Sequence, residues 1–236
     1  MKKLEYLVVG TGRCGTAYMA QLLTSMGIPC GHESIFSTNA IMEIKNKLKN
    51  PNSINLSECS LDQEAKWVNP KEIIADSSYL AAPFLKYGFL KNTKIIHVVR
   101  HPVDVIKSFV FSGLYFENFV PKKSEIYQDF IKKHVPEVYD NGFNSLTRAA
   151  IYYILWNKMI EKNIRFHENY FLYNLESSPS KLMDFLGKKK YNRKLSKKIN
   201  SWKKHDLKFH LKYIYPDVLK ELKEFSAKYN YHLVKI

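Results

Sequence analysis

A glycine-rich turn near the amino terminus holds the first residues that could do chemistry. Residues 10–16 read GTGRCGT and separate an apolar run from a segment with helical spacing. In such a turn, backbone N–H groups and the dipole of the following helix together attract an anion. Arg13 adds a positive charge inside the turn. The sequence therefore predicts an anion-binding loop.

The loop lacks the groups that Mg-ATP requires. Gly10 and Gly15 have P-loop spacing, but Thr16 and Ala17 stand where nucleoside triphosphatases have a lysine for the phosphates and a hydroxyl for Mg²⁺. We therefore do not expect the anion to be Mg-ATP. A P-loop kinase or another nucleotide phosphotransferase remains an alternative, and a requirement for Mg²⁺ would identify it.

Two other interpretations of the loop depend on its glycines and its cysteine. The glycines fit the GxGxxG fingerprint of dinucleotide sites, with Glu33 about 20 residues further along as the acidic partner. Arg13 and Cys14 are unusual within such a turn. A phosphatase of the Cys-x5-Arg type is excluded, because position 20 is Ala20. A purely structural glycine turn stays open at this stage.

A second basic site follows the clearest predicted strand, residues 94–99. Arg100 comes directly after this strand, and Ser108 lies eight residues later, two turns into the helix predicted over 103–111. An arginine can bind phosphate through two parallel hydrogen bonds, and a serine adds a hydroxyl. Alternatively, Arg100 pairs with Asp104, and Ser108 is an ordinary surface residue.

The elements that position these residues alternate between apolar runs and helical spacing, which indicates an α/β fold. We predict a three-layer, P-loop-like domain with a central, largely parallel sheet flanked by helices. The loops that follow the first four strands should share one crevice at the carboxyl ends of the strands. Predicted strands span 5–10, 28–33, 72–76, 94–99 and 170–175; predicted helices span 17–26, 38–49, 80–90, 103–111, 143–163, 179–187 and 216–229.

Charge is concentrated toward the carboxyl end of what we predict to be a single domain, residues 1–236. The formal net charge is +15, and the basic, helical segment 187–236 holds 15 Lys/Arg against 4 Asp/Glu. Such a run forms a solvated surface or attracts an anion such as a nucleotide, an acidic glycan or nucleic acid. A nucleic-acid-binding module is a second alternative, but the sequence has no RRM, KH or helix-turn-helix signature.

Several classes of protein are excluded by composition. Three cysteines without a CxxC pair do not fit a disulfide scaffold or a zinc ribbon, and no His/Cys spacing predicts a metal site. No apolar run approaches the roughly 20 residues of a membrane span. Glu5 interrupts the first apolar run, which therefore predicts a strand and not an export signal. We expect a cytoplasmic protein that binds neither membrane nor nucleic acid.

Together, the two basic sites resemble motifs of the sulfotransferase family. Residues 10–16 resemble its 5′-phosphosulfate loop, and residues 100–108, RHPVDVIKS, resemble its 3′-phosphate motif. Trp156-Asn157, residues 173–175 and residues 185–187 are similar to the later half of the family. The resemblance covers residues 5 to about 205, in the motif style of bacterial and tyrosylprotein-type members.

This resemblance implies transfer of a sulfuryl group from 3′-phosphoadenosine-5′-phosphosulfate (PAPS) to a hydroxyl or amine, in line and without a metal. Arg100 and Ser108 would hold the 3′-phosphate. Ala17 departs from the second Thr or Ser of many members, and the chain lacks their Arg-Lys-Gly triplet, for which Lys203 and Lys204 are the expected substitute. The 5′-phosphosulfate would contact Arg13, the Thr16 hydroxyl and the backbone of Cys14, Gly15, Thr16 and Ala17.

In-line transfer to a hydroxyl needs a base. Residues 31–33 read GHE and resemble the Gly-Glu-Glu segment of tyrosylprotein-type sulfotransferases, which implies that Glu33 is the base. His32 is the rival, and Glu33 could instead pair with Arg13 or cap a helix. A third, weaker candidate is Asp76. We expect the acceptor side to be lined by Asp76, Ser77, Ser78 and Tyr79.

The acceptor itself has no signature: a small molecule, a glycan and a peptide all remain open. Residues 36–70 and 110–140 are expected to form its walls, and the basic tail would suit an acidic glycan. The aromatic residues of this part of the chain could stack on a sugar or phenol, or belong to the core (Phe109, Phe111, Tyr115, Phe116 and Phe119). A soluble member of this family points to a bacterial, archaeal or viral source.

Overall fold

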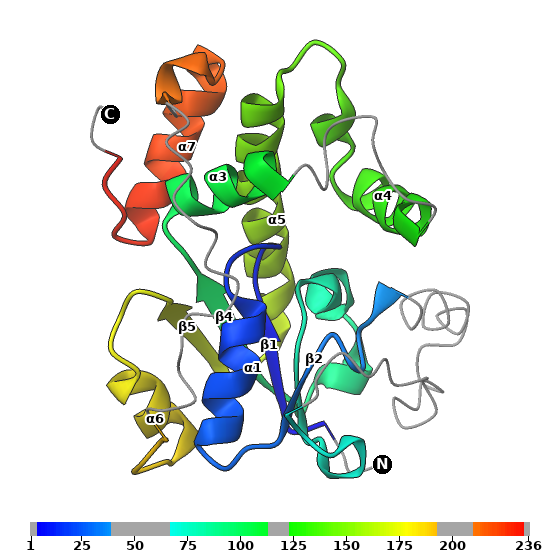
Figure 1. Ribbon diagram of the computed structural model, residues 1–236, viewed down its shortest axis with the longest axis vertical. Helices are drawn as coiled ribbons and strands as arrows, with labels where there is room; N and C mark the ends of the chain where they lie inside the picture. Colours follow the sequence, from blue (N-terminus) through cyan, green and yellow to red (C-terminus); the bar gives the residue numbers. More distant parts are fainter. Residues whose placement is uncertain (1–3, 39–66, 113–122, 193–209, 234–236) are drawn as a thin grey trace.

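The computed structural model describes residues 4–38, 67–112, 123–192 and 210–233. In this part of the chain, five strands form one sheet in the order β2-β3-β1-β4-β5, and every pair of neighbours is parallel (Figure 1). The α/β prediction with a parallel sheet is thus confirmed. The strands are β1 Tyr6–Val9, β2 Cys30–His32, β3 Ala75–Ser77, β4 Lys94–Val99 and β5 Tyr170–Asn174.

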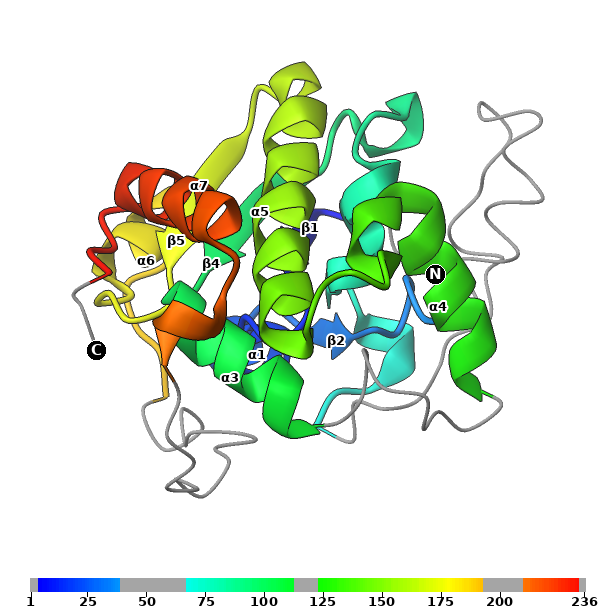
Figure 2. The ribbon, with the colours of Figure 1, turned by 90° about the horizontal axis from the view of Figure 1, so that it is seen from above.

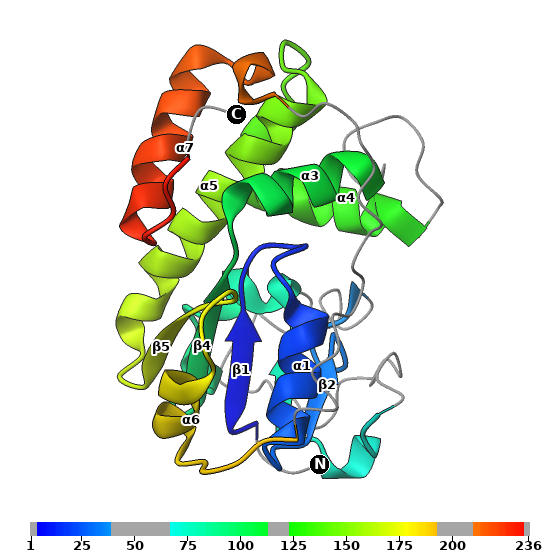
Figure 3. The ribbon, with the colours of Figure 1, turned by 60° about the vertical axis from the view of Figure 1, so that its left-hand side comes forward.

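Helices cover both faces of the sheet, which gives three layers (Figures 1 and 3). The Phe185 ring of α6 stacks on Phe171 of β5 on one face, and the Asn157 Oδ1 of α5 accepts a hydrogen bond from the His97 Nε2 of β4 on the other. The α-helices are α1 Thr16–Ser25, α3 Pro102–Ser112, α4 Lys123–His134, α5 Ser145–Asn163, α6 Ser180–Leu186 and α7 Pro216–Lys228. Short 3₁₀ turns are η3 Pro70–Glu72, η4 Tyr79–Phe84, η5 Gly88–Leu90, η6 Pro136–Tyr139, η7 Ile164–Phe166 and η9 Leu211–Tyr213.

The central position of α5 explains how distant segments meet. Viewed from above, α5 runs across the middle of the molecule with α7 on one side and α4 on the other (Figure 2). Its long run of buried residues includes Tyr152, Tyr153 and Trp156, each at most 1% exposed. A helix that is apolar around most of its circumference is buried by its neighbours, so α5 can contact the sheet, α3 and α7 at once.

The prediction of a helix over residues 80–90 is wrong. The segment forms two 3₁₀ turns instead, η4 and η5. Pro83 lies inside η4 and has no backbone N–H to continue an α-helix, and Gly88 begins η5. The apolar character that suggested a helix is real, because every side chain from Tyr79 to Phe84 is buried.

One strand boundary and one helix also differ from the sequence predictions. The strand predicted over residues 72–76 starts later, at Ala75, because η3 occupies Pro70–Glu72. Helix α4 had no counterpart among the predicted elements. Most of the helix predicted over 38–49 lies outside the described residues. No helix in the described ranges is long and apolar enough to cross a membrane.

The order of the strands determines where a ligand would bind. Strand β1 lies between β3 and β4, so the chain runs to opposite sides of β1 in its first and second halves. In open parallel sheets, ligands bind beyond the carboxyl ends of the strands at such a reversal. The loops after β1, β2, β3 and β4 all leave from this edge, which brings the predicted site residues together.

Candidate active site

The glycine-rich turn connects β1 to α1 at the centre of this edge. A Cβ atom on Gly10 would lie 2.5 Å from both the Cys14 Sγ and the Val98 carbonyl oxygen, so no larger residue fits without movement of the backbone. Gly15 has φ of 102°, a conformation that L side chains rarely adopt. The glycines at these two positions are therefore requirements of the turn's geometry.

Helices from far along the chain hold this turn in place. The Gly12 N–H donates a hydrogen bond to the Tyr152 hydroxyl of α5 at 3.2 Å. The Phe109 ring of α3 packs edge-on against Tyr152, with centroids 4.9 Å apart, and a Cβ on Gly12 would lie 3.1 Å from it. Phe109 is 1% exposed. Of the two roles left open for Phe109, the structure therefore supports the core and not an acceptor surface.

The amino terminus of α1 is available to an anion. Among the described residues, no side chain caps this helix, and its first turn contains no acidic residue. The first N–H groups of a helix lack partners within the helix and carry partial positive charge. These N–H groups include those of Thr16 and Ala17, two of the predicted contacts to an anion.

The Cys14 thiol is buried, and the Cys14 backbone N–H already donates to the Thr11 carbonyl at 3.3 Å, so its contact with an anion stays a prediction. The side chain is 1% exposed, and burial raises the pKa of the Cys14 thiol to about 12. A thiol with such a pKa stays protonated at neutral pH and is a poor nucleophile. The structure thus agrees with the exclusion of a cysteine phosphatase.

The two basic motifs meet at one corner of the site. The Arg13 Nε donates a hydrogen bond to the Ser108 Oγ at 2.8 Å, and the Arg100 Nη1 donates to the Arg13 carbonyl oxygen at 3.2 Å. Arg100 also lies 3.8 Å from Asp104, the pairing considered as an alternative. Arg13 itself has φ of 64°, in the left-handed region. The structure therefore brings Arg13 together with Arg100, which lies 87 residues further along the chain, and with Ser108, which lies 95 residues further along.

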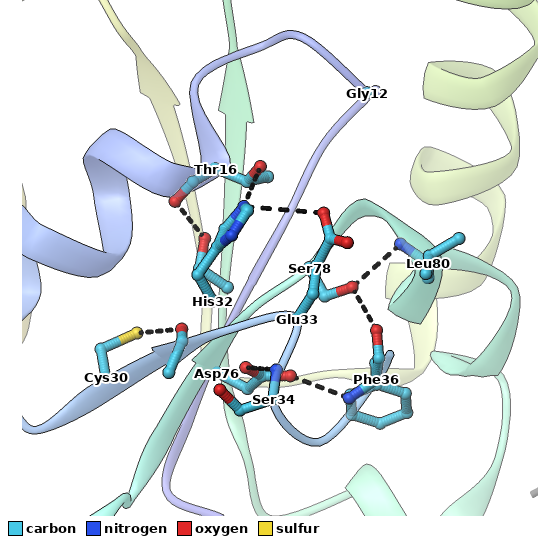
Figure 4. A network of polar contacts seen from close by, with 12 residues as sticks. Gly12, Thr16, Cys30, His32, Glu33, Ser34, Phe36, Asp76, Ser78 and Leu80 are labelled. Carbon is cyan, nitrogen blue, oxygen red and sulfur yellow. Dashed lines mark hydrogen bonds and ion pairs between the residues drawn. The ribbon is translucent and has the colours of Figure 1, made fainter. Parts of the chain in front are cut away.

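His32 is the last residue of β2, and Glu33 follows it close to the start of α1 (Figure 4). The His32 Nε2 lies 3.2 Å from the Thr16 Oγ1 and 3.6 Å from a Glu33 carboxylate oxygen. Burial lowers the pKa of His32 to about 4, so its imidazole is neutral at neutral pH. The contact with Glu33 is therefore between a carboxylate and a neutral ring, and not an ion pair.

The segment that carries Glu33 is held by Asp76 (Figure 4). The buried Asp76 carboxylate accepts hydrogen bonds from three consecutive backbone N–H groups, those of residues 34–36, at 2.9 to 3.1 Å. Burial raises the pKa of Asp76, while these hydrogen bonds oppose the shift. Asp76 thus fixes the turn after Glu33. The Glu33 backbone N–H donates to the Ser77 carbonyl at 3.2 Å.

The residues predicted to line the acceptor side are buried. The Ser77 Oγ donates to the Thr16 carbonyl, and the Ser78 Oγ donates to the Phe36 carbonyl, both at 2.8 Å. With Asp76, these residues serve the scaffold in the structure. Tyr79 is 8% exposed and packs edge-on against Tyr127 of α4. Their role toward an acceptor, and that of Asp76 as a base, stay predictions.

Sequence reasoning missed Tyr152 and Tyr153 as supports of the site. Tyr152 contacts the glycine turn, and the Tyr153 hydroxyl donates to the Arg100 carbonyl at 3.1 Å. Helical spacing placed Tyr153 on a buried face but carried no signal for these partners. Lys203 and Lys204 lie outside the described residues. In the ranges that the structure describes, no three His, Cys, Asp or Glu side chains form a metal site.

Comparisons with known proteins agree with this geometry at the level of fold. No family model and no curated protein matches the sequence. The sulfotransferase domain from the curacin biosynthetic pathway is 14% identical, over 99% of this chain and 100% of that chain, with a TM-score of 0.54. A sulfotransferase from Alicyclobacillus acidocaldarius is 14% identical, over 99% of this chain and 98% of its own, with a TM-score of 0.48. The first likeness shows that this chain has the fold of a sulfotransferase domain, as the two basic motifs predicted.

Proposed function

We propose that the protein is a sulfotransferase that takes a sulfuryl group from PAPS and transfers it to a hydroxyl or amine. The observation that carries this proposal is the corner where Arg13, Ser108 and Arg100 meet beside the uncapped amino terminus of α1. It offers two cationic groups and a row of backbone N–H donors, which suits a nucleotide with phosphate groups at two positions. The shared fold supports the same assignment.

The 5′ end of the donor would bind at the glycine turn. The N–H groups of Gly15, Thr16 and Ala17 and the guanidinium of Arg13 are the groups placed to hold it. Gly10 and Gly12 let the turn pack closely against Val98 and Phe109, which fixes the backbone that would face the ligand. These residues fit the donor without the lysine that Mg-ATP requires.

The 3′-phosphate would bind at Arg100 and Ser108. Arg100 is a third exposed, and its turn at the end of β4 is fixed by the hydrogen bond from Tyr153. The Ser108 hydroxyl, which accepts from Arg13 in the structure, lies two helical turns into α3. One phosphate at this position would contact both residues, which accounts for their spacing of eight positions in the sequence.

Glu33 is the group that we assign to proton removal. When the sulfuryl group leaves PAPS, its bond to the 5′-phosphate breaks, and adenosine 3′,5′-bisphosphate remains. The Glu33 carboxylate takes the proton from the acceptor hydroxyl as the oxygen attacks. The neutral His32 lies 3.2 Å from the Thr16 hydroxyl and 3.6 Å from the Glu33 carboxylate, so it packs between the glycine turn and the base. Arg13 stabilises the negative charge that develops on the group in transfer.

The test is direct transfer of label. Purified protein is incubated with PAPS labelled in its sulfuryl group, in EDTA, with a panel of phenols, sugars, acidic glycans, peptides and amines. We expect label in at least one acceptor class and release of adenosine 3′,5′-bisphosphate. A parallel reaction contains Mg-ATP labelled in its γ-phosphate. Transfer from ATP without transfer from PAPS would overturn the proposal in favour of a kinase.

A further inference from the structure

The backbone of the turn that carries Arg100 is held by groups from three other parts of the chain. Tyr153 of α5 donates to the Arg100 carbonyl, and the Leu175 N–H donates to the Val99 carbonyl at 2.8 Å. The third support is a pair of side chains, Glu176 after β5 and Tyr231 after α7. Neither belongs to the motifs from which the site was predicted.

Glu176 bridges Tyr231 to the turn. One carboxylate oxygen of Glu176 accepts a hydrogen bond from the His101 backbone N–H at 3.0 Å, and the other accepts from the Tyr231 hydroxyl at 2.5 Å. The Tyr231 hydroxyl also lies 3.4 Å from the Val99 carbonyl oxygen, and its ring packs edge-on against the His101 ring. The residues on both sides of Arg100 are thus tied to the same pair.

The end of α7 delivers Tyr231 to this place. Asn230 has φ of 62°, and the N–H groups of Asn230 and Tyr231 donate to the carbonyls of Ala227 and Ser226. This is the Schellman arrangement, which ends a helix and reverses the chain. Tyr231 is 8% exposed, and burial raises the pKa of its phenol, so the hydroxyl stays protonated and donates.

We propose that Glu176 and Tyr231 are positioning residues for Arg100, which set the affinity of the site for a 3′-phosphate. This inference rests on the proposed function. A guanidinium binds phosphate well only when two of its N–H groups are directed in parallel at the phosphate oxygens. A turn that loses its supports lets the Arg100 side chain sample positions away from its hydrogen bond with the Arg13 carbonyl. Affinity for the 3′-phosphate falls, while the glycine turn keeps its affinity for the 5′ end.

The experiment compares two nucleotides that differ only in the 3′-phosphate. Dissociation constants for adenosine 3′,5′-bisphosphate and for 5′-AMP are measured by calorimetry on the full chain. For Tyr231→Phe, which removes one hydroxyl and keeps the ring, we expect the bisphosphate to bind about tenfold more weakly. The affinity for 5′-AMP should stay within about twofold of wild type, because 5′-AMP makes no contact with Arg100. Glu176→Ala, a change at the exposed end of the pair, should have the same effect and leaves the core intact.

Tyr229→Phe is the matched control. Tyr229 lies two residues before Tyr231 and is also buried, and its hydroxyl donates to Glu161 at 2.8 Å, away from the Arg100 turn. We expect a loss of thermal stability in Tyr229→Phe but an unchanged ratio of the two dissociation constants.

The outcomes separate this inference from the proposed function. Equal weakening of both nucleotides in Tyr231→Phe and Glu176→Ala, or an unchanged ratio, would overturn the positioning role while the function stands. A wild-type protein that binds 5′-AMP as tightly as the bisphosphate would overturn the 3′-phosphate site itself, and the positioning role with it.

Discussion

The two sides of the site differ in how the chain builds them. The donor side, defined as residues 10–16 with Arg100 and Ser108, is joined by hydrogen bonds between residues 87 to 140 positions apart. The base side, defined as residues 32–36 with Asp76, is closed by hydrogen bonds that span 40 to 42 positions. The donor side therefore depends on the packing of α3 and α5, whereas the base side depends on one buried carboxylate between two neighbouring strands.

The two sides also differ in charge. The donor side has two guanidinium groups, and Arg100 is a third exposed. On the base side, the histidine is neutral and the buried carboxylate is saturated with backbone N–H donors. The two sides meet at Thr16, whose hydroxyl contacts His32 and whose carbonyl accepts from Ser77. Binding of the anion and removal of the proton should therefore be separable by mutation.

The largest expected effect separates turnover from binding. Glu33→Gln keeps the shape of the side chain but removes the base, so we expect the transfer rate to fall by about 10²- to 10⁴-fold. Affinity for adenosine 3′,5′-bisphosphate should stay near wild type by calorimetry. Glu168→Gln, which changes an exposed carboxylate before β5, is the control. Full activity of Glu33→Gln would show that the base is assigned to the wrong residue.

Arg100→Ala should have the opposite pattern. Loss of a charged hydrogen-bond donor to phosphate costs about 1.5 to 3 kcal/mol, which weakens the bisphosphate by roughly 10- to 150-fold. The melting temperature should fall only slightly, because the variant loses one partly buried hydrogen bond, to the Arg13 carbonyl, and one surface ion pair. Arg165→Ala removes an exposed arginine at the far end of the sheet and should not affect binding. If both arginine variants bind equally well, the donor side has no 3′-phosphate site.

Asp76→Asn tests whether the base side depends on this carboxylate. The amide retains one acceptor oxygen for three N–H groups, so we expect the free energy of unfolding to fall by about 2 to 3 kcal/mol. Asp184→Asn, at an exposed position of α6, should change it by less than about 0.5 kcal/mol. Urea unfolding measures both variants. A Asp76→Asn protein of wild-type stability would mean that the three N–H groups find other partners.

Two buried histidines predict how stability changes with pH. Burial lowers the pKa of both His32 and His97 from 6.5 to about 4. Between pH 6.5 and 4 the unfolded chain binds protons that the folded chain does not, so stability falls as the pH is lowered. At pH 5 each histidine should account for about 2 kcal/mol of this loss. Urea unfolding at pH 7 and pH 5 measures this loss of stability. His97→Gln, which lies outside both sides of the site, should remove about half of the loss that the two histidines cause, and His32→Gln should remove the other half. Equal pH dependence in wild type and both variants would contradict this assignment.

Local patterns in the sequence were enough to predict the sheet. Strand β4 occupies the residues predicted for it, because its four β-branched apolar residues (Ile95, Ile96, Val98 and Val99) are typical of a short buried strand. The segment after Tyr79 was predicted incorrectly for a local reason as well, since Pro83 was given too little weight against the apolar composition. The apolar residues of helix α4 also indicate a helix, because Tyr127, Phe130 and Ile131 have helical spacing.

Only the residues within the two motifs of the site could be predicted from the sequence. The sequence placed Arg13 and Arg100 near the same anion because both follow strands of one sheet. It could not predict that Arg13 donates to Ser108, or that Tyr152 supports the glycine turn, because these contacts depend on how α3 and α5 pack. Asp76 was expected to face an acceptor. Its carboxylate instead points to the turn after β2, where it accepts hydrogen bonds from backbone N–H groups.

The central claim is that the donor side binds a nucleotide with phosphates at both its 3′ and 5′ positions. Thermal unfolding is measured with adenosine 3′,5′-bisphosphate, with 5′-AMP and with Mg-ATP, each over a range of concentrations. Ligand at about 100 times its dissociation constant adds about 2.7 kcal/mol of stability, which raises the melting temperature of a chain of this size by roughly 5 to 10 °C. We predict the largest shift with the bisphosphate, a smaller one with 5′-AMP and none with Mg-ATP. A shift with Mg-ATP and none with the bisphosphate would contradict the account.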